Sequence, residues 1–131
     1  MGMMRTILLI EDDVSLNDLM AGFLRQSGFE VLGVYNGVEG LRAYRQTACD
    51  VVITDILMPE MEGLEMIIEM KQLNPAVRII AITGGGYHGN QDHLLECAKC
   101  FGAEHILKKP IVLGDLVALL HSMKAGSPSR S

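Results

Sequence analysis

Residues 50–63, which read DVVITDILMPEMEG, decide the fold class of this chain. The stretch opens with three aliphatic residues, and Thr54 and the lone carboxylate of Asp55 close that run. Such a pattern is typical of a parallel strand that is buried on both faces. Because ligands bind at the carboxyl edge of open α/β sheets, we predict that Asp55 is a reactive carboxylate at this edge. The Met-Pro pair at 58–59 then turns the chain, and Gly63 is expected to relieve the backbone before the next helix.

The bulk composition is that of one folded domain. The chain has 131 residues, of which 49% are hydrophobic and 21% charged. A formal net charge of −5 argues against nucleic-acid binding by this domain, which would need clustered Lys and Arg. No apolar run approaches the roughly 18 residues of a membrane span, and the N-terminal apolar run is too short for a signal peptide. We therefore expect a cytoplasmic protein without a membrane partner, and its three cysteines indicate no disulfide framework.

Apolar patterns along the rest of the chain predict alternating strands and helices. The strands are expected at residues 5–10, 31–34, 50–54, 77–82 and 105–107. The helices are expected at residues 16–24, 38–44, 64–73, 94–101 and 113–123. Ser15 should N-cap the first helix and Gly28 should follow it as the C′ residue, while Gly33 indicates an edge strand or a close backbone approach. Five alternations predict one α/β domain, with a parallel sheet covered on both faces.

Polar side chains follow four of these predicted strands. Glu11 and Asp12 follow the first, Asp55 the third, Thr83 the fourth and Lys109 the fifth. In a parallel sheet these groups converge on one edge, where carboxylates that repel one another need a hard cation such as Mg²⁺. A lysine and a hydroxyl beside that cation are donors for phosphoryl oxygens. Together these groups are the parts needed for phosphoryl transfer to an aspartate.

Several motifs follow one another in the order of a known family: ILLIEDD at 7–13, ITDILMPEMEG at 53–63, AIT at 81–83 and GAEHILKKP at 102–110. On these motifs the chain resembles the receiver domain of two-component response regulators, the family of the bacterial chemotaxis regulator, from residue 5 to about residue 124. The resemblance implies a three-layer, flavodoxin-like (βα)5 fold, with a doubly wound parallel five-stranded sheet of strand order 2-1-3-4-5. It also implies a receiver domain at 5–124. The small and polar residues at 125–131 are expected to form a disordered tail or a truncated linker.

The resemblance assigns a role to each carboxylate. Asp55 would accept a phosphoryl group from the phosphohistidine of a sensor histidine kinase or a phosphotransfer protein. Glu11, Asp12 and Asp55 would bind Mg²⁺ together with the backbone carbonyl of Leu57. The domain would then be no enzyme in the usual sense, because it would catalyse only its own phosphorylation and dephosphorylation.

Two further residues would complete the switch. Thr83 would hydrogen-bond to the phosphoryl group, and Lys109 would pair with it; the Lys109–Pro110 peptide is cis in many relatives. Movement of Thr83 would change the surface around the fourth and fifth strands and the last helix, for a downstream protein that the sequence does not identify. Lys108 is expected to be solvated.

The sequence departs from the family pattern in three places. Ile106 stands where the family commonly has an aromatic residue, so an aromatic switch cannot be carried over. The loop GGGYHGN at 84–90 is longer than usual, and is either a flexible surface loop or a lid in which Tyr87 replaces the missing aromatic residue. His93, Cys97 and Cys100 have a helical spacing that would suit a zinc site or a redox pair. Buried structural cysteines are the favoured interpretation.

Two features bear on turnover and assembly. Leu57, two residues beyond Asp55, would not orient a water, so we predict slow autodephosphorylation. The predicted helix at 113–123 is apolar on more than one face, which core packing or a dimer surface would explain.

Other functions stay open at this point. A phosphatase or mutase of the aspartyl-phosphate superfamily would carry a second Asp at the position of Leu57. A mononucleotide-binding flavodoxin-like protein would need a phosphate-binding loop after the first strand, where this chain is acidic. The remaining alternatives are a pseudo-receiver that binds its partner without phosphorylation, and a receiver fragment of a larger regulator with an output domain.

Overall fold

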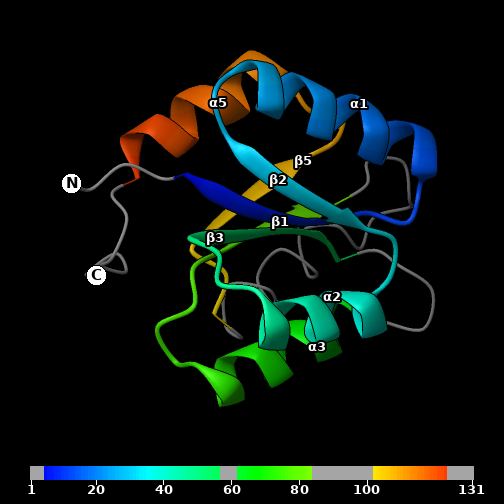
Figure 1. The fold of residues 1–131 in the computed structure, drawn as a ribbon, viewed down its shortest axis with the longest axis vertical. Coiled ribbons are helices and arrows are strands. Elements are labelled where there is room, and N and C mark those ends of the chain that lie inside the picture. Colours follow the sequence, from blue (N-terminus) through cyan, green and yellow to red (C-terminus); the bar gives the residue numbers. More distant parts are fainter. Residues whose placement is uncertain (1–4, 57–61, 84–101, 124–131) are drawn as a thin grey trace.

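The computed structural model describes residues 5–56, 62–83 and 102–123, which form one sheet between two layers of helices (Figure 1). The strands are β1 (Thr6–Ile10), β2 (Glu30–Val34), β3 (Val51–Asp55), β4 (Ile79–Thr83) and β5 (His105–Lys108). The helices are α1 (Val14–Gln26), α2 (Gly37–Gln46), α3 (Glu62–Leu73) and α5 (Leu113–Ser122). Every predicted strand is therefore present, with ends shifted by one or two residues. The predicted helix at 94–101 and the loop at 84–90 lie outside the described residues, as does the tail at 125–131.

All strand pairs are parallel, and the strand order is β2-β1-β3-β4-β5. This confirms the predicted doubly wound, flavodoxin-like fold. The inner strands β3 and β4 are buried along their whole length, whereas β2 is an edge strand with alternating exposure. The edge position predicted for Gly33 is confirmed. The close approach at this glycine is made by a side chain, since a Cβ built there would lie 2.5 Å from Asn17 Oδ1.

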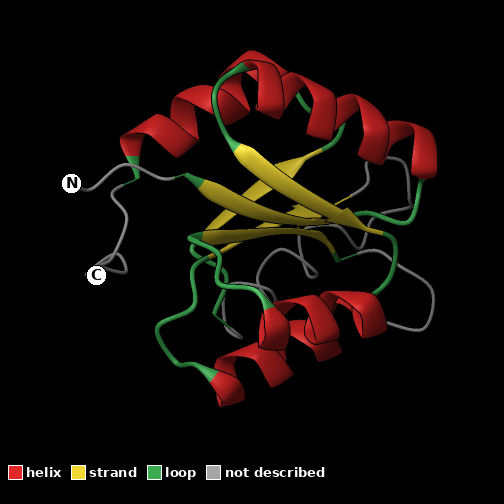
Figure 2. Ribbon diagram, viewed as in Figure 1, coloured by secondary structure: helices red, strands yellow, loops and turns green. Residues whose placement is uncertain are grey.

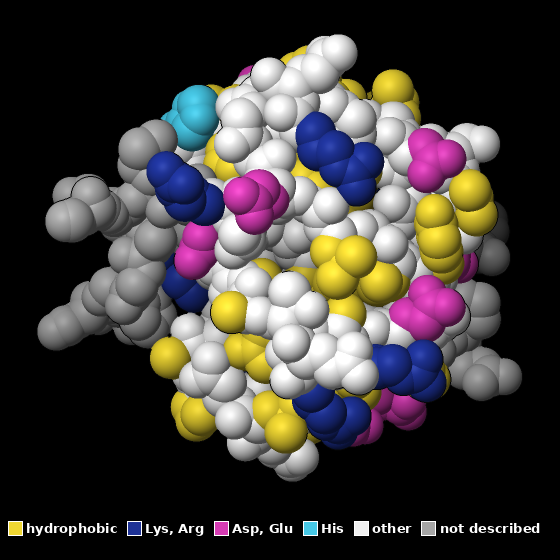
Figure 3. Space-filling view, in the orientation of Figure 1, with side chains coloured by type: hydrophobic (Ala, Val, Ile, Leu, Met, Phe, Trp, Pro, Cys, Tyr) yellow, Lys and Arg dark blue, Asp and Glu magenta, His cyan; other side chains and the backbone are white. Residues whose placement is uncertain are grey.

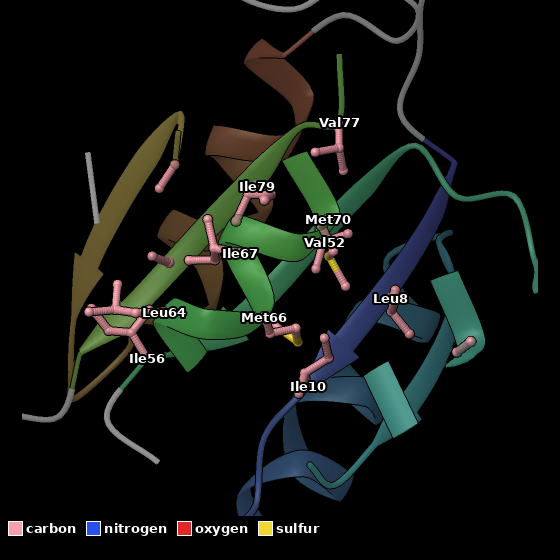
Figure 4. Packing of buried hydrophobic residues seen from close by; sticks show 13 residues of the cluster. Leu8, Ile10, Val52, Ile56, Leu64, Met66, Ile67, Met70, Val77 and Ile79 are labelled. Carbon is pink, nitrogen blue, oxygen red and sulfur yellow. The ribbon is translucent and has the colours of Figure 1, made fainter. Parts of the chain in front are cut away.

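Successive side chains of each strand point to opposite faces of the sheet, and this divides the core into two. Figure 2 shows one pair of helices above the strands and one pair below them. Ile7 and Leu9 pack under α1 and α5, and Leu8 and Ile10 pack under α2 and α3. Figure 4 shows the second of these cores, where methionine and aliphatic side chains of α3 fill the space over β1, β3 and β4.

Helix α5 contributes to the first of these cores. Leu116 and Leu120 are buried there, and Leu113, Val117 and Leu119 pack against the same cluster half-buried. Core packing therefore accounts for apolar residues on more than one face of this helix. Among the described residues, no helix is long and apolar enough to cross a membrane.

The start of α1 differs from the prediction. Its N-cap is Asp13, whose carboxylate accepts a hydrogen bond of 3.1 Å from the Leu16 backbone N–H, and Ser15 lies inside the helix. The helix begins two residues earlier than its apolar spacing indicated, because the last acid of the acidic triplet at 11–13 is itself a strong cap. Gly28 follows the C-cap with φ +103°, as predicted for the C′ position.

A nearly buried ion pair ties β4 to β5 at the edge of the sheet opposite Asp55. Arg78 Nη2 donates to Glu104 Oε2 at 2.6 Å, and Arg78 Nε donates to Glu104 Oε1 at 2.9 Å. The exposed fractions of the two side chains are 7% and 11%. The hydrogen bond from Arg78 lowers the pKa of Glu104 below its ordinary 4.5, against the opposing effect of burial.

We expect Glu104→Gln to lower the free energy of unfolding at neutral pH by about 1.5–3 kcal/mol, the usual contribution of hydrogen bonds to a charged group. Since the folded state holds Glu104 ionised to lower pH than the unfolded chain does, this contribution is complete above pH 4.5 and is lost as the pH falls below it. Denaturant unfolding at pH 7 and pH 3 checks this, with the exposed Glu69→Gln as control. An equal difference between the variants at both pH values would contradict the assignment.

Candidate functional site

The parallel sheet brings the predicted polar residues to one edge. Glu11 and Asp12 directly follow β1, Asp55 ends β3, Thr83 ends β4 and Lys109 follows β5. Their strands are in register at this edge, where Asp55 pairs with Ile82 and Thr83 with Lys108. The Lys109 backbone N–H also donates to the Thr83 carbonyl at 2.8 Å. The expected convergence of the strand ends is confirmed.

Three carboxylates form an acidic cluster at this edge. Oxygens of Glu11, Asp12 and Asp55 all lie within 4.8 Å of one another, with Glu11 and Asp55 buried and Asp12 exposed. Lys109 Nζ donates to Asp55 Oδ2 at 2.8 Å and lies 3.1 Å from Glu11 Oε1. One lysine therefore faces two buried carboxylates, and a third carboxylate lies beside them.

The electrostatics of the cluster favour an additional cation. Burial raises the pKa of Glu11 to about 7, and the charge of Asp55 adds to this, while the Asp13 N–H and Lys109 oppose it. Burial alone would lower the pKa of Lys109, but its hydrogen bond to Asp55 and the charges of both carboxylates outweigh burial and raise it. Lys109 is therefore a fixed positive charge, and the carboxylates around it outnumber it.

The donor set fits a divalent hard cation. Glu11 Oε1 is buried and has no hydrogen-bond partner of good geometry, although Lys109 lies near it as an ion pair. Carboxylate oxygens are the ligands that Mg²⁺ prefers, and it retains waters that a phosphoryl oxygen can replace. Glu11, Asp12 and Asp55 therefore fit Mg²⁺; the expected fourth contributor, Leu57, lies outside the described residues.

The other predicted positions divide into those described and those outside the described part of the chain. Thr83 Oγ1 is buried and has no hydrogen-bond partner among the described residues, so its donor and acceptor capacity is available at the strand end. The Lys109–Pro110 peptide is cis and Lys108 is exposed, both as expected. Ile106 packs half-buried against the core under α2 and α3. His93, Cys97, Cys100 and Tyr87 fall outside the described residues.

Two groups around the cluster were not predicted. The Asp13 backbone N–H donates to Glu11 Oε2 at 3.1 Å, and the buried side chain of Asn17 donates to the Glu11 carbonyl at 3.1 Å. The signal for Asn17 was a polar residue among the apolar positions of α1, directly beside Leu16. Its second partner, the Val34 carbonyl on β2, could not be identified from that pattern.

Mg²⁺ is expected to stabilise the folded protein, because the acidic cluster that would bind it exists only when β1 and β3 are paired. At a concentration ten times its dissociation constant, the gain is about 1.4 kcal/mol. Thermal unfolding with Mg²⁺ and with chelator measures this. Asp12→Asn should lose the effect, whereas Asp18→Asn, an exposed carboxylate on α1, should retain it. A stabilisation by Mg²⁺ that is equal in both variants would contradict binding at this cluster.

Known proteins match this chain over most of its length. The family model of the response regulator receiver domain matches residues 7–121. The transcriptional regulatory protein ZraR of Klebsiella oxytoca is 32% identical over 127 residues, which are 93% of this chain and 28% of that regulator. A response regulator receiver domain protein from Clostridium thermocellum has a TM-score of 0.79 at 32% identity, covering 90% of this chain and 92% of that one. NtrX from Brucella abortus has a TM-score of 0.81 at 28% identity, covering 92% of this chain and 27% of that one. The chain thus spans less than a third of ZraR and NtrX.

Proposed function

The chain belongs to the response regulator receiver domain family, and from this premise we propose that it is a phosphorylation-switched signalling module in which Asp55 is the phosphoacceptor. The observation that carries the proposal is the position of Asp55, at the end of an inner strand and 2.8 Å from Lys109. Its other oxygen would attack the phosphorus of a phosphohistidine in a sensor kinase or a phosphotransfer protein. The P–N bond breaks as the O–P bond forms, and the histidine nitrogen leaves with the electron pair.

Glu11 and Asp12 hold Mg²⁺ beside Asp55, with the Leu57 backbone carbonyl as a further ligand. The support for this is the acidic cluster, in which Glu11 Oε1 is buried and has Lys109 as an ion-pair partner at 3.1 Å but no hydrogen bond of good geometry among the described residues. The bound ion supplies charge that offsets the repulsion between the carboxylates and the incoming phosphoryl oxygens.

Lys109 and Thr83 would then bind the phosphoryl group on Asp55. A phosphoryl group on Asp55 adds about −1.5 to −2 charge, and Lys109 is already positioned to pair with it. The Thr83 hydroxyl, which lacks a partner among the described residues, would hydrogen-bond to the same group. Because Thr83 ends β4 and its backbone carbonyl accepts a hydrogen bond from the Lys109 N–H, a movement of Thr83 would also shift the backbone that follows β5.

A downstream protein or an output domain would recognise the surface that phosphorylation changes. Residues 5–124 are the receiver unit in this proposal, a cytoplasmic module. The regulators ZraR and NtrX, of which this chain spans less than a third, favour a larger regulator as one setting for it. On the face shown in Figure 3, Lys and Arg side chains lie interspersed with Asp and Glu and with apolar residues.

The test is the intact mass of the protein after incubation with acetyl phosphate and Mg²⁺. We expect one added phosphoryl group, and none when a chelator replaces Mg²⁺. If no group is added, the metal-dependent complex with beryllofluoride is the second readout. Failure of both would overturn the proposal in favour of a module that binds its partner without phosphorylation.

A further inference from the structure

Asn17 is a polar residue on the buried face of α1. Its side chain is 2% exposed, and it lies in the same helix as the buried Met20, Ala21 and Leu24. A buried carboxamide is costly unless its hydrogen bonds are made. An apolar residue at this position could pack on the core but could not make the hydrogen bonds of Asn17.

Those contacts join three elements of the fold. Asn17 Nδ2 donates to the Glu11 carbonyl at 3.1 Å and to the Val34 carbonyl at 2.8 Å. The Val34 carbonyl also accepts from the Glu11 backbone N–H at 3.1 Å. The backbone of Glu11 is therefore held on both sides, by Val34 directly and by Asn17 from α1, at the point where β1 ends and the acidic residues begin.

Gly33 makes room for this carboxamide. A Cβ at Gly33 would lie 2.5 Å from Asn17 Oδ1 and 3.4 Å from its Cγ. Strand β2 therefore has no side chain at the position that the Asn17 amide contacts. Two residues on different elements, Asn17 and Gly33, are matched to each other around the Glu11 backbone.

We propose that Asn17 is a positioning residue for the acidic cluster, and that its contact with Gly33 and Glu11 sets the affinity of the cluster for Mg²⁺. This rests on the proposed function, in which Glu11 and Asp12 hold the ion. Glu11 Oε2 is already fixed by the Asp13 N–H at 3.1 Å, so the side chain moves with its backbone. A shift of that backbone displaces the Glu11 carboxylate and the adjacent Asp12 together. Residues that orient metal ligands typically change affinity by about 10–100-fold when they are replaced.

Two substitutions perturb the contact from opposite sides. Asn17→Leu keeps the number and branching of the side-chain heavy atoms but removes both N–H donors and leaves the buried Glu11 carbonyl without this partner. Gly33→Ala removes no donor but pushes the carboxamide away. Displacing the buried carboxamide costs stability, and the smaller conformational freedom that alanine gives the unfolded chain offsets part of this loss. If Asn17 had a merely structural role, any variant with the same loss of stability would lose the same Mg²⁺ affinity. If Asn17 positions the cluster, only the variants that disturb its contact lose affinity.

The experiment is calorimetric titration of the folded protein with Mg²⁺ alone, beside denaturant unfolding of each variant. We expect the dissociation constant to rise about tenfold or more in both Asn17→Leu and Gly33→Ala. Gly22→Ala, on the same helix with open space around it, and Glu104→Gln, destabilised at the opposite edge, should bind as the wild type does. If the wild type binds Mg²⁺ and both variants bind it equally well, the positioning role of Asn17 is wrong while the proposed function stands. The same follows if Asn17→Leu weakens binding and Gly33→Ala does not. A wild-type protein that does not bind Mg²⁺ would instead overturn the proposed function, and this role with it.

Discussion

Replacement of Asp55 by Asn is expected to abolish phosphoryl uptake from acetyl phosphate in the presence of Mg²⁺. Asparagine preserves the shape of the side chain, but its amide has no anionic oxygen to form the bond to phosphorus. The change also removes one of the three carboxylates whose oxygens lie within 4.8 Å of one another. The intact mass of the Asp55→Asn protein should therefore stay unchanged under conditions that add one phosphoryl group to the wild type.

The matched control is Asp18→Asn, which removes an exposed carboxylate of α1 outside the cluster. It should take up the phosphoryl group as the wild type does. Thermal unfolding of both variants establishes that each is folded under the reaction conditions. A phosphoryl group found on the Asp55→Asn protein would place the acceptor at another residue, and would contradict the proposed chemistry.

The topology could be predicted from the sequence because the informative residues are local. Apolar runs such as residues 7–10 and 79–82 are long enough to identify buried strands, and the sheet buries them completely. Once the strands are parallel, polar residues at their carboxyl ends must meet. The parallel topology therefore predicts that Glu11, Asp55 and Lys109 lie close together, without any knowledge of distances.

What could not be predicted depends on distances between elements. Asn17 was visible only as a polar residue in an apolar helix, and its partners lie on β2 and at the end of β1. The N-cap of α1 is Asp13 instead of the predicted Ser15, because the helix begins directly after the acidic residues that follow β1, and the apolar spacing of α1 does not indicate this. Thr83 could be placed at a strand end, but the absence of a hydrogen-bond partner for its buried hydroxyl among the described residues required coordinates.

Gly63 shows the same limit. Its position after a Met-Pro pair indicated a residue that relieves a turn, yet it lies within α3 as its second residue. The requirement there is space. A Cβ at Gly63 would lie 2.5 Å from the Ile56 Cα and 2.6 Å from the Asp55 carbonyl oxygen. Both atoms are backbone at the end of β3, so a rotamer change cannot relieve the contact.

Gly63→Ala is accordingly expected to lower the free energy of unfolding by about 3 kcal/mol, at the upper end of the usual cost of overpacking. The first turn of α3 has to move away from β3, and the buried side chains Leu64 and Ile67 move with it. The higher helix propensity of alanine returns only about 1 kcal/mol. Denaturant unfolding of the variant beside the wild type measures the difference.

The same substitution at Gly22 should have the opposite sign. Gly22 lies inside α1, and a Cβ there meets nothing within 4 Å, so Gly22→Ala gains about 0.5–1 kcal/mol from helix propensity alone. Because the Asp55 carbonyl is one of the atoms displaced at Gly63, the Gly63→Ala protein should also take up phosphoryl groups more slowly while still folded, whereas Gly22→Ala should not. Equal stability of the two variants would mean that α3 can withdraw from β3 without cost, and that the end of the acceptor strand is not held by the packing of this helix.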